Sequence, residues 1–318
     1  MRILHTSDWH LGRQLHGVSL LEDQSHVLDQ IVDIAEKESV DVFLIAGDVY
    51  DRAIPPADAV SLLSRTLNRL CLDLGKAVVT IKGNHDSGER LGFGADLMGE
   101  SGLHIVGPLD SDLIPITLEK NEVTVDIFGL PYAGPLTVRD IFDVEVASHD
   151  EAMSALLARV DEHKTDGRPT VLMGHCFVDG GEESDSERPL SVGGADRISA
   201  SLFKPYSYVA LGHLHRPQSR EHEHVRYSGS ILKYSFSEVE HEKSVTIIDI
   251  VDAGDVTSRT VPLRSLRDLR IVDGTLEEIL DAGRTDPKSD DYILARISDK
   301  HAVLDVMGKL RDVYPNVC

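Results

Sequence analysis

Five apolar runs in this 318-residue chain each end in a short loop that is rich in Asp, His or Asn. The runs have the length and composition of buried strands, and helix-like segments alternate with them over residues 1–250. In chain order the loops are Ser7-Asp8-Trp9-His10, Gly47-Asp48, Gly83-Asn84-His85-Asp86, Gly174-His175 and Gly212-His213-Leu214-His215. In layered α/β folds, ligands gather at the carboxyl ends of the strands. The pattern therefore predicts an α/β fold with one functional site at these strand ends.

The order of elements changes near Pro262. Up to that point long α/β units dominate, and a strand over residues 244–251 is expected to be antiparallel and exposed on one face. Beyond it the chain shows a short strand, a helix, a strand and a helix. We therefore predict two domains, residues 1–262 and residues 263–318. Within the first domain, residues 180–187 form an acidic stretch that is typical of a flexible surface loop.

The composition excludes several classes of protein. With 41% hydrophobic and 27% charged residues the chain is an ordinary globular protein, and no apolar stretch approaches the roughly 18 to 20 residues of a membrane helix. Three cysteines without a CxxC pair indicate neither a disulfide framework nor a thiolate zinc site. The N-terminus lacks the regions of a signal peptide, which predicts a cytoplasmic protein. A net charge of −22 argues against binding to a polyanion, although divalent cations on acidic ligands would offset part of it.

The loops together supply the donors of a metal centre. A single His at a strand end is more often simply hydrogen-bonded, but the joint pattern is much less common. Carboxylates, imidazoles and an amide oxygen without a thiolate suit manganese, iron or zinc. Two hydrolytic metal ions lie about 3.5 to 4 Å apart and share a ligand, and Asp48 after Gly47 fits that bridging role. The candidate ligands are Asp8, His10, Asp48, Asn84, His175, His213 and His215.

The motifs resemble those of the calcineurin-like metallophosphoesterases, in the same order. They are Asp8-x-His10, Gly47-Asp48-x-x-Asp51, Gly83-Asn84-His85-Asp86, Gly174-His175 and Gly212-His213-x-His215. Four further segments are similar to bacterial exonucleases of the SbcD type: residues 1–12, residues 46–51 with Pro55-Pro56, residues 227–230 and residues 234–238. The resemblance covers nearly the whole chain. It implies a layered metallophosphoesterase β-sandwich flanked by helices, followed by a small DNA-binding capping domain.

The resemblance also implies roles for the site residues. One metal ion would be held by Asp8, His10, Asp48 and His215, and the other by Asp48, Asn84, His175 and His213, with manganese as the usual metal. His85 is then free to protonate the leaving group as a general acid. Asp51 is the expected partner that orients the His85 ring, and Asp86 is the other candidate. Arg52 either contacts phosphate, as in the phosphatase branch of the superfamily, or is a solvated loop residue.

Three functions are compatible with the sequence. The first, implied by the SbcD resemblance, is a two-metal DNA nuclease that acts on duplex ends and on single strands or hairpins. The second is a phosphatase or cyclic-nucleotide phosphodiesterase that uses the same metal ions on a small substrate. The third is an inactive scaffold that binds DNA or a partner. The intact ligand set and His85 argue against the third, and only the resemblance favours the first over the second.

The resemblance further implies partners. Relatives of this type act in DNA break and hairpin processing with an SbcC-type coiled-coil ATPase and form a homodimer through helices. Apolar residues in two segments could form that dimer surface or could simply be core: Ala57, Val60, Leu63, Leu67, Leu91, Phe93, Leu97 and Met98. Residues 314–318 resemble a turn before another strand. We therefore expect a truncated chain that cleaves weakly and does not assemble with the ATPase, the alternative being a short natural protein with an open sheet edge.

Overall fold

Two six-stranded mixed sheets form the body of the molecule, in a computed structural model that describes residues 1–188, 190, 196–252, 255–301 and 304–318. The first sheet has the order β16-β15-β1-β4-β5-β6. Its strands are β1 (Arg2–Thr6), β4 (Val42–Ile45), β5 (Ala77–Ile81), β6 (Leu103–Val106), β15 (Ser244–Asp252) and β16 (Asp255–Pro262). The pairs β1·β4, β4·β5 and β5·β6 are parallel, whereas β15 is antiparallel to both β1 and β16.

The second sheet has the order β13-β14-β12-β9-β8-β7. Its strands are β7 (Ile116–Lys120), β8 (Val123–Leu130), β9 (Thr170–His175), β12 (Tyr208–Gly212), β13 (Gln218–Arg220) and β14 (His222–Tyr227). The central strands β8, β9, β12 and β14 are parallel, and each edge strand is antiparallel to its neighbour. Each sheet therefore contains four neighbouring parallel strands, whose carboxyl ends lie at the same edge of the sheet.

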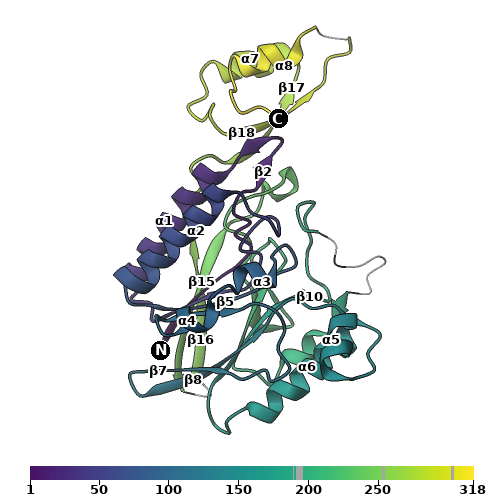
Figure 1. The fold of residues 1–318 in the computed structure, drawn as a ribbon. Helices are drawn as coiled ribbons and strands as arrows, with labels where there is room; N and C mark the ends of the chain where they lie inside the picture. The colour runs from purple at the N-terminus through teal and green to yellow at the C-terminus, as the bar shows by residue number, and fades with distance from the viewer. Residues whose placement is uncertain (189, 191–195, 253–254, 302–303) are drawn as a thin grey trace.

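Helices cover the outer face of each sheet, so that the body has four layers (Figure 1). Long helices α1 (Leu21–Lys37) and α2 (Ala57–Asn68) pack on the first sheet, and α5 (Pro135–Phe142) and α6 (His149–His163) pack on the second. Because successive side chains of a strand point to opposite faces, Ile3 packs between the sheets while Leu4 packs toward the helices. The layered β-sandwich flanked by helices that the sequence predicted is confirmed.

Shorter elements connect the layers. They are β2 (Gln14–Leu15), β3 (Val18–Ser19), the π-helical turn η1 (Arg69–Asp73), α3 (Gly88–Leu91), α4 (Ala95–Gly99), β10 (Phe177–Val178), β11 (Arg197–Ile198), and the 3-10 turns η2 (Ala200–Phe203) and η3 (Phe236–Glu238). No helix among the described residues is long and apolar enough to cross a membrane.

The expectation for residues 244–251 was partly wrong. The strand β15 is antiparallel to its neighbours, as predicted, but residues 244–248 are buried rather than exposed on one face. The reason is its place inside the sheet, where Ile247 packs toward the helices and Ile248 packs between the two sheets. The outer strand β16 carries the exposed positions instead.

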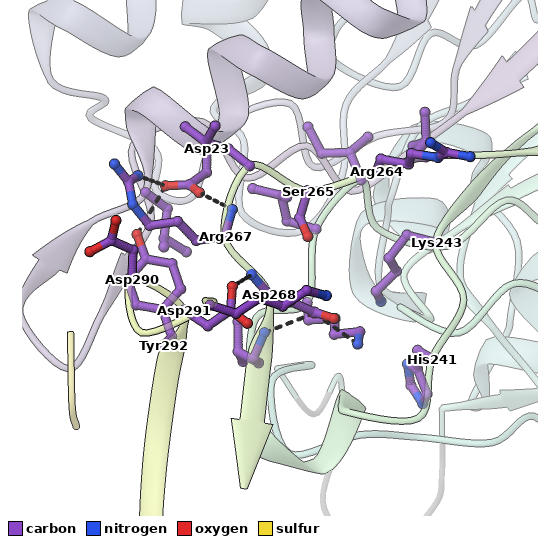
Figure 2. A pocket seen from close by; sticks show the side chains of 18 of the residues that line it. Asp23, His241, Lys243, Arg264, Ser265, Arg267, Asp268, Asp290, Asp291 and Tyr292 are labelled. Carbon is purple, nitrogen blue, oxygen red and sulfur yellow. Dashed lines mark hydrogen bonds and ion pairs between the residues drawn. The ribbon is translucent and has the colours of Figure 1, made fainter. Parts of the chain in front are cut away.

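A smaller unit lies at one end of the body (Figure 1). Its parallel strands β17 (Leu269–Gly274) and β18 (Tyr292–Ile297) pack with helices α7 (Leu276–Gly283) and α8 (Val306–Arg311) around a core of their own. A cleft of about 740 Å³ separates the unit from the body, and Figure 2 shows its lining. At one wall the carboxylate of Asp23, on α1, accepts hydrogen bonds from Arg267 and from the Tyr292 hydroxyl, at 3.0 and 2.9 Å.

Candidate metal centre

Glycines allow loops from the two sheets to approach each other closely. A Cβ atom at Gly83 would lie 2.1 Å from the Asp48 Oδ1 atom, and one at Gly212 would lie 1.9 Å from the Ala46 carbonyl oxygen. Gly47 has a φ of +88°, and a Cβ there would lie 2.4 Å from His175 Nδ1. None of these contacts is possible for a real Cβ atom. The meeting of the strand ends therefore depends on glycine at these positions.

Several candidate ligands have strained backbones. Asp8, His10 and Asp48 lie in the left-handed region, with φ of 52°, 44° and 49°, and His213 has a φ of 106°. Such conformations are uncommon for residues other than glycine, and they concentrate at functional sites. They aim these side chains toward one point between the two sheets.

Asp48 lies at the centre of the cluster. Its Oδ2 atom is 3.4 Å from His175 Nε2, 3.7 Å from His10 Nε2 and 4.0 Å from His85 Nε2. Its Oδ1 atom accepts a hydrogen bond from the His85 backbone amide at 2.8 Å, which fixes the carboxylate plane. The side chain is 2% exposed. Asp48 could therefore act as a ligand that two ions share.

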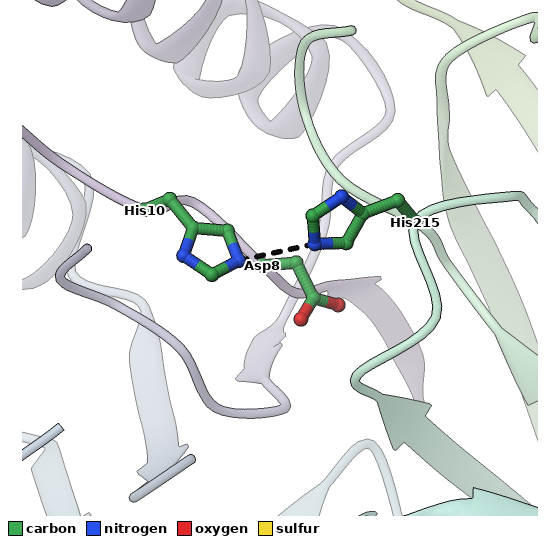
Figure 3. A group of neighbouring side chains, drawn as sticks. All are labelled: Asp8, His10 and His215. Atoms are coloured by element: carbon green, nitrogen blue, oxygen red, sulfur yellow. Dashed lines mark hydrogen bonds between the residues drawn. The ribbon is translucent and has the colours of Figure 1, made fainter. Parts of the chain in front are cut away.

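Asp8, His10 and His215 converge on one another, with ligand atoms within 4.8 Å of each other, and Figure 3 shows the three side chains. The Nε2 atoms of His10 and His215 face each other at 3.1 Å, and both rings are buried. The Asp8 carboxylate is held by the Ser7 hydroxyl and by the His213 backbone amide, which lies 3.0 and 3.1 Å from its two oxygens. These three side chains could hold one ion together with Asp48.

His175 and Asn84 meet beside the Asp48 carboxylate. His175 Nδ1 donates to the Ala46 carbonyl oxygen at 2.8 Å, because that oxygen can only accept. The Nε2 atom of His175 then faces the Oδ1 atom of Asn84 at 2.9 Å as well as the Asp48 carboxylate. Electron-rich atoms at these distances need a cation between them, either a proton or a metal ion. The donor set therefore fits a divalent metal ion.

The charges of the buried groups agree with this geometry. Burial raises the pKa of Asp8 to about 6, whereas it lowers the pKa of His213 to about 3. Burial also acts to raise the pKa of Asp48, but the neighbouring His175 holds that pKa well below its ordinary value. Asp48 in turn outweighs the burial of His175 and raises its pKa to about 9. Without a metal ion the pair is therefore a carboxylate with a positive imidazole beside it.

His213 lies beside this cluster. Its ring meets the His175 ring edge-on, with centroids 5.5 Å apart. Its ring nitrogens do not belong to the groups of three or more His, Cys, Asp or Glu ligand atoms that lie within 4.8 Å of one another among the described residues. Those groups are Asp8 with His10 and His215, Asp8 with Asp48 and His175, and His10 with Asp51 and His85.

His85 faces the cluster without joining the groups around Asp8. Its Nδ1 atom donates to the backbone carbonyl oxygen of Asp51 at 2.7 Å, which leaves Nε2 directed toward Asp48. The sequence led us to expect this contact from the Asp51 carboxylate. That carboxylate instead lies 3.4 Å from Arg13 and 3.8 Å from His10 Nδ1. A main-chain contact was not predictable from side-chain chemistry.

Asp86 and Arg52 have other surroundings. The Asp86 carboxylate accepts from the backbone amides of Val49, Tyr50 and Gly83, at 2.9 to 3.1 Å, and so ties the loop after β4 to the loop after β5. It does not orient His85. Arg52 has a side chain 61% exposed and lies 3.8 Å from the Asp51 carboxylate.

Two protein-family models together match most of the chain. Residues 1–217 match the calcineurin-like phosphoesterases, and residues 265–318 match a family described as the type 5 capsule protein repressor C-terminal domain. The chain is 36% identical over its full length to the SbcD component of nuclease SbcCD from Staphylococcus epidermidis, and covers 84% of it. This chain belongs to the SbcD family of calcineurin-like phosphoesterases.

A second relative gives the same result. The SbcD component of nuclease SbcCD from Staphylococcus saprophyticus is 36% identical over 99% of this chain, which covers 83% of the relative. Among solved structures, a dimetal phosphatase from Danio rerio aligns at 11% identity with a TM-score of 0.42, over 83% of this chain and 99% of the other. As a member of the SbcD family, the chain is a metal-dependent hydrolase of phosphodiester bonds. Its His and Asp groups suit a dinuclear centre of divalent ions.

A group of residues behind His215 was not predicted from the sequence. Residues 180–187 were expected to be a flexible surface loop, but Ser186 is buried and its hydroxyl contacts His215 Nδ1 at 2.5 Å. Glu187 accepts from the His215 backbone amide at 2.7 Å, and Arg13 donates to the Ser186 carbonyl at 3.0 Å. The acidic composition of the loop predicts an exposed segment, and it does not indicate that Ser186 and Glu187 contact His215. A signal in the sequence is the segment from Tyr234 to Glu238, which resembles the SbcD family. Its Glu238 carboxylate accepts a hydrogen bond from the Ser186 hydroxyl.

Proposed function

We propose that this chain is a two-metal DNA nuclease, an exonuclease on duplex ends and an endonuclease on single strands and hairpins. The observation that carries the proposal is Asp48, whose Oδ2 atom lies within 4.0 Å of three imidazole nitrogens. A centre of two ions bridged by one carboxylate is a general means of cleaving phosphodiester bonds. Both Staphylococcus relatives carry the name of a nuclease, which supports DNA over a small ester as the substrate.

The ligands divide into two sets around Asp48. We assign Asp8, His10 and His215 to one ion and Asn84, His175 and His213 to the other, with Asp48 shared. The facing Nε2 atoms of His10 and His215 support the first set, and the contact between His175 and Asn84 supports the second. For His213 the support is its ring position beside His175. Manganese is the proposed metal, on the basis of the family.

His85 is the proposed general acid. When bound, the two ions would supply a hydroxide at neutral pH and stabilise the charge that develops on the phosphate. The remaining need is a proton for the leaving oxygen. The Asp51 carbonyl accepts the hydrogen of His85 Nδ1, so that a second proton on Nε2 would point into the site. We therefore propose Asp51 as a positioning residue through its main chain. For Arg52 a phosphate contact and a solvated loop position stay open, since its side chain is 61% exposed beside Asp51.

A comparison of substrates tests the proposal. Purified protein with Mn²⁺ should release nucleotides from an end-labelled duplex, and should open a DNA hairpin. The same preparation is given bis(p-nitrophenyl) phosphate and cyclic AMP, the substrates expected of the phosphatase or phosphodiesterase alternative. Activity on the small esters with none on any DNA would contradict the nuclease proposal, and activity on DNA would support it.

A second copy of the chain is the proposed partner on the surface of α2 and α4. An apolar groove of about 420 Å³ lies there, and Phe93 and Val60, which line it, are 83% and 44% exposed. Leu97 on α4 is 81% exposed and precedes Met98, which also lines the groove. Leu63 and Leu91, by contrast, are buried in the core. Apolar side chains this exposed on a soluble fold commonly mark an interaction surface. A homodimer through this groove would place two active sites on one DNA substrate.

An SbcC-type ATPase is the other proposed partner, because the relatives are named as components of a nuclease SbcCD. We propose that the pair processes DNA breaks and hairpins in the cytoplasm. Residues 263–318, which have a core of their own, are the proposed DNA-capping domain. Gel filtration of the chain with an SbcC protein tests the assembly, since stable co-elution would place the binding surface within residues 1–318.

A further inference from the structure

The two ring nitrogens of His215 face different surroundings. Nε2 lies 3.1 Å from His10 Nε2, inside the candidate metal centre. Nδ1 lies 2.5 Å from the hydroxyl of Ser186, on the far side of the ring. His215 and Ser186 are 1% and 7% exposed, so the pair is shielded from water. Which nitrogen carries the hydrogen therefore depends on Ser186 and on what Ser186 contacts.

The Ser186 hydroxyl has one hydrogen and three close neighbours: His215 Nδ1, Glu238 Oε1 and the Ser184 hydroxyl, which lies 3.0 Å away and donates its own hydrogen to Glu187. Ser186 donates its hydrogen to the Oε1 atom of Glu238, a side chain that is fully buried. The other carboxylate oxygen of Glu238 lies 2.6 Å from the ammonium of Lys243, and Oε1 also accepts from the Tyr234 backbone amide at 3.1 Å. A carboxylate paired in this way accepts hydrogen bonds and has none to give. Ser186 can therefore only accept from His215.

We infer that Lys243, Glu238 and Ser186 form a relay that fixes the hydrogen of His215 on Nδ1 and turns the lone pair of Nε2 toward the metal. Ser186 is a positioning residue, since it acts through His215 and does not reach the reacting atoms. The inference rests on the proposed function in one respect, which is that His215 is a metal ligand. Groups that orient a ligating imidazole in this way commonly change metal affinity by roughly 10- to 100-fold.

The relay differs from the arrangement at the other side of the site. There the hydrogen of His175 Nδ1 is taken by a backbone carbonyl, at 2.8 Å from Ala46, which no substitution removes. At His215 the same task is given to a side chain on the loop of residues 180–187. That loop is held by the Glu187 contact to the His215 amide and by the hydrogen bond from the Asp185 amide to the Ser237 hydroxyl. A side-chain substitution can therefore change the orientation of His215, whereas none removes the carbonyl that orients His175.

Histidine nitrogen spectra of the metal-free protein test the inference directly. In ¹⁵N-labelled wild-type protein, the His215 signals should place the hydrogen on Nδ1, as the contact to Ser186 requires. In Ser186→Ala the ring loses its acceptor and should show a mixture of both tautomers. The matched control is Ser237→Ala, which removes a hydroxyl that holds the same loop but does not touch His215. Its spectrum should equal that of the wild type.

Calorimetric titration with Mn²⁺ alone gives the second readout. Ser186→Ala should weaken one of the two binding steps by roughly 10- to 100-fold and leave the other unchanged, whereas Ser237→Ala should leave both unchanged. A wild-type His215 with its hydrogen on Nε2 overturns the inference, as does a Ser186→Ala protein with the wild-type tautomer and affinity. A wild-type protein that binds no metal contradicts the proposed function instead, and its spectrum still decides the tautomer.

Discussion

The two carboxylate oxygens of Asp48 have different neighbours, and these neighbours differ from those of the His85 ring. Its Oδ1 atom is held by a backbone amide, and its Oδ2 atom is left to the imidazoles. The His85 ring, by contrast, makes its closest contact with a carbonyl oxygen, and its Nε2 atom is 4.0 Å from Asp48. These contacts support the proposed roles, in which the first residue holds metal and the second moves a proton.

Substitution of the two residues should therefore have different effects. His85→Ala should keep both metal ions while cleavage falls by roughly 10² to 10⁴-fold, the loss expected of a missing general acid. Asp48→Ala should lose metal as well as activity. Metal content by mass spectrometry, measured beside the cleavage rate, separates the two, and a His85→Ala protein that had lost a metal ion would show that His85 is a ligand.

Gly83 is a further test at the scale of one residue. A Cβ atom there would lie 2.1 Å from the Asp48 carboxylate, so Gly83→Ala should displace the bridging group and weaken metal binding. Gly134→Ala is the control, because nothing lies within 4 Å of its Cβ position. Both proteins are titrated with Mn²⁺ after their helix content is checked by circular dichroism. Equal affinities in the two proteins would contradict the packing described for Gly83.

At the scale of elements, the parallel strands and their polar ends could be predicted because each leaves a local pattern. A buried strand appears in the sequence as an apolar run, and the ligand at its end appears as an Asp or His that follows the run. The contact between Ser186 and His215 leaves no such pattern, because the two residues are 29 apart and belong to different loops. The buried face of β15 was missed for the same reason, since burial depends on which strands become its neighbours. Local chemistry was predictable, whereas long-range pairing was not.

The apolar surface of α2 and α4 gives a prediction at the same scale. Leu97 is 81% exposed, so Leu97→Asp should leave the fold intact and shift a homodimer toward the monomer by placing a charge in its interface. Leu136→Asp on α5 is the control, since Leu136 is 67% exposed on another helix. Sedimentation velocity at micromolar concentration measures the change. A monomeric wild-type protein, or two variants with the same dimer fraction, would contradict the proposed interface.

At the scale of the whole molecule, Asp23 ties the smaller unit to the body. It is 1% exposed and accepts from Arg267 and Tyr292, so Asp23→Ala leaves the hydroxyl of the buried Tyr292 without its acceptor and should destabilise the protein by about 1 to 3 kcal/mol. Glu22→Ala removes an ion pair to the same arginine on the surface, where the Glu22 side chain is 70% exposed, and should cost under about 1 kcal/mol. Urea unfolding curves compare the two variants, and equal losses would show that Asp23 does not anchor the unit.

The net charge of −22 gives the metal ions a second role at this scale. DNA is a polyanion, and the chain has 32 basic residues against 54 acidic ones. Two divalent ions on Asp8, Asp48 and their neighbours would make the site locally positive within a negative surface. Under the proposed function, binding of DNA and its cleavage would therefore both depend on a centre with two ions.

Anomalous X-ray scattering from crystals grown with Mn²⁺ tests that centre most directly. We predict two peaks about 3.5 to 4 Å apart, with the Asp48 carboxylate bridging them, and with the ligands divided into the sets proposed above. His85 should contact neither peak. A single peak, two peaks that Asp48 does not bridge, or a peak bound by His85 would contradict the two-metal centre proposed for this chain.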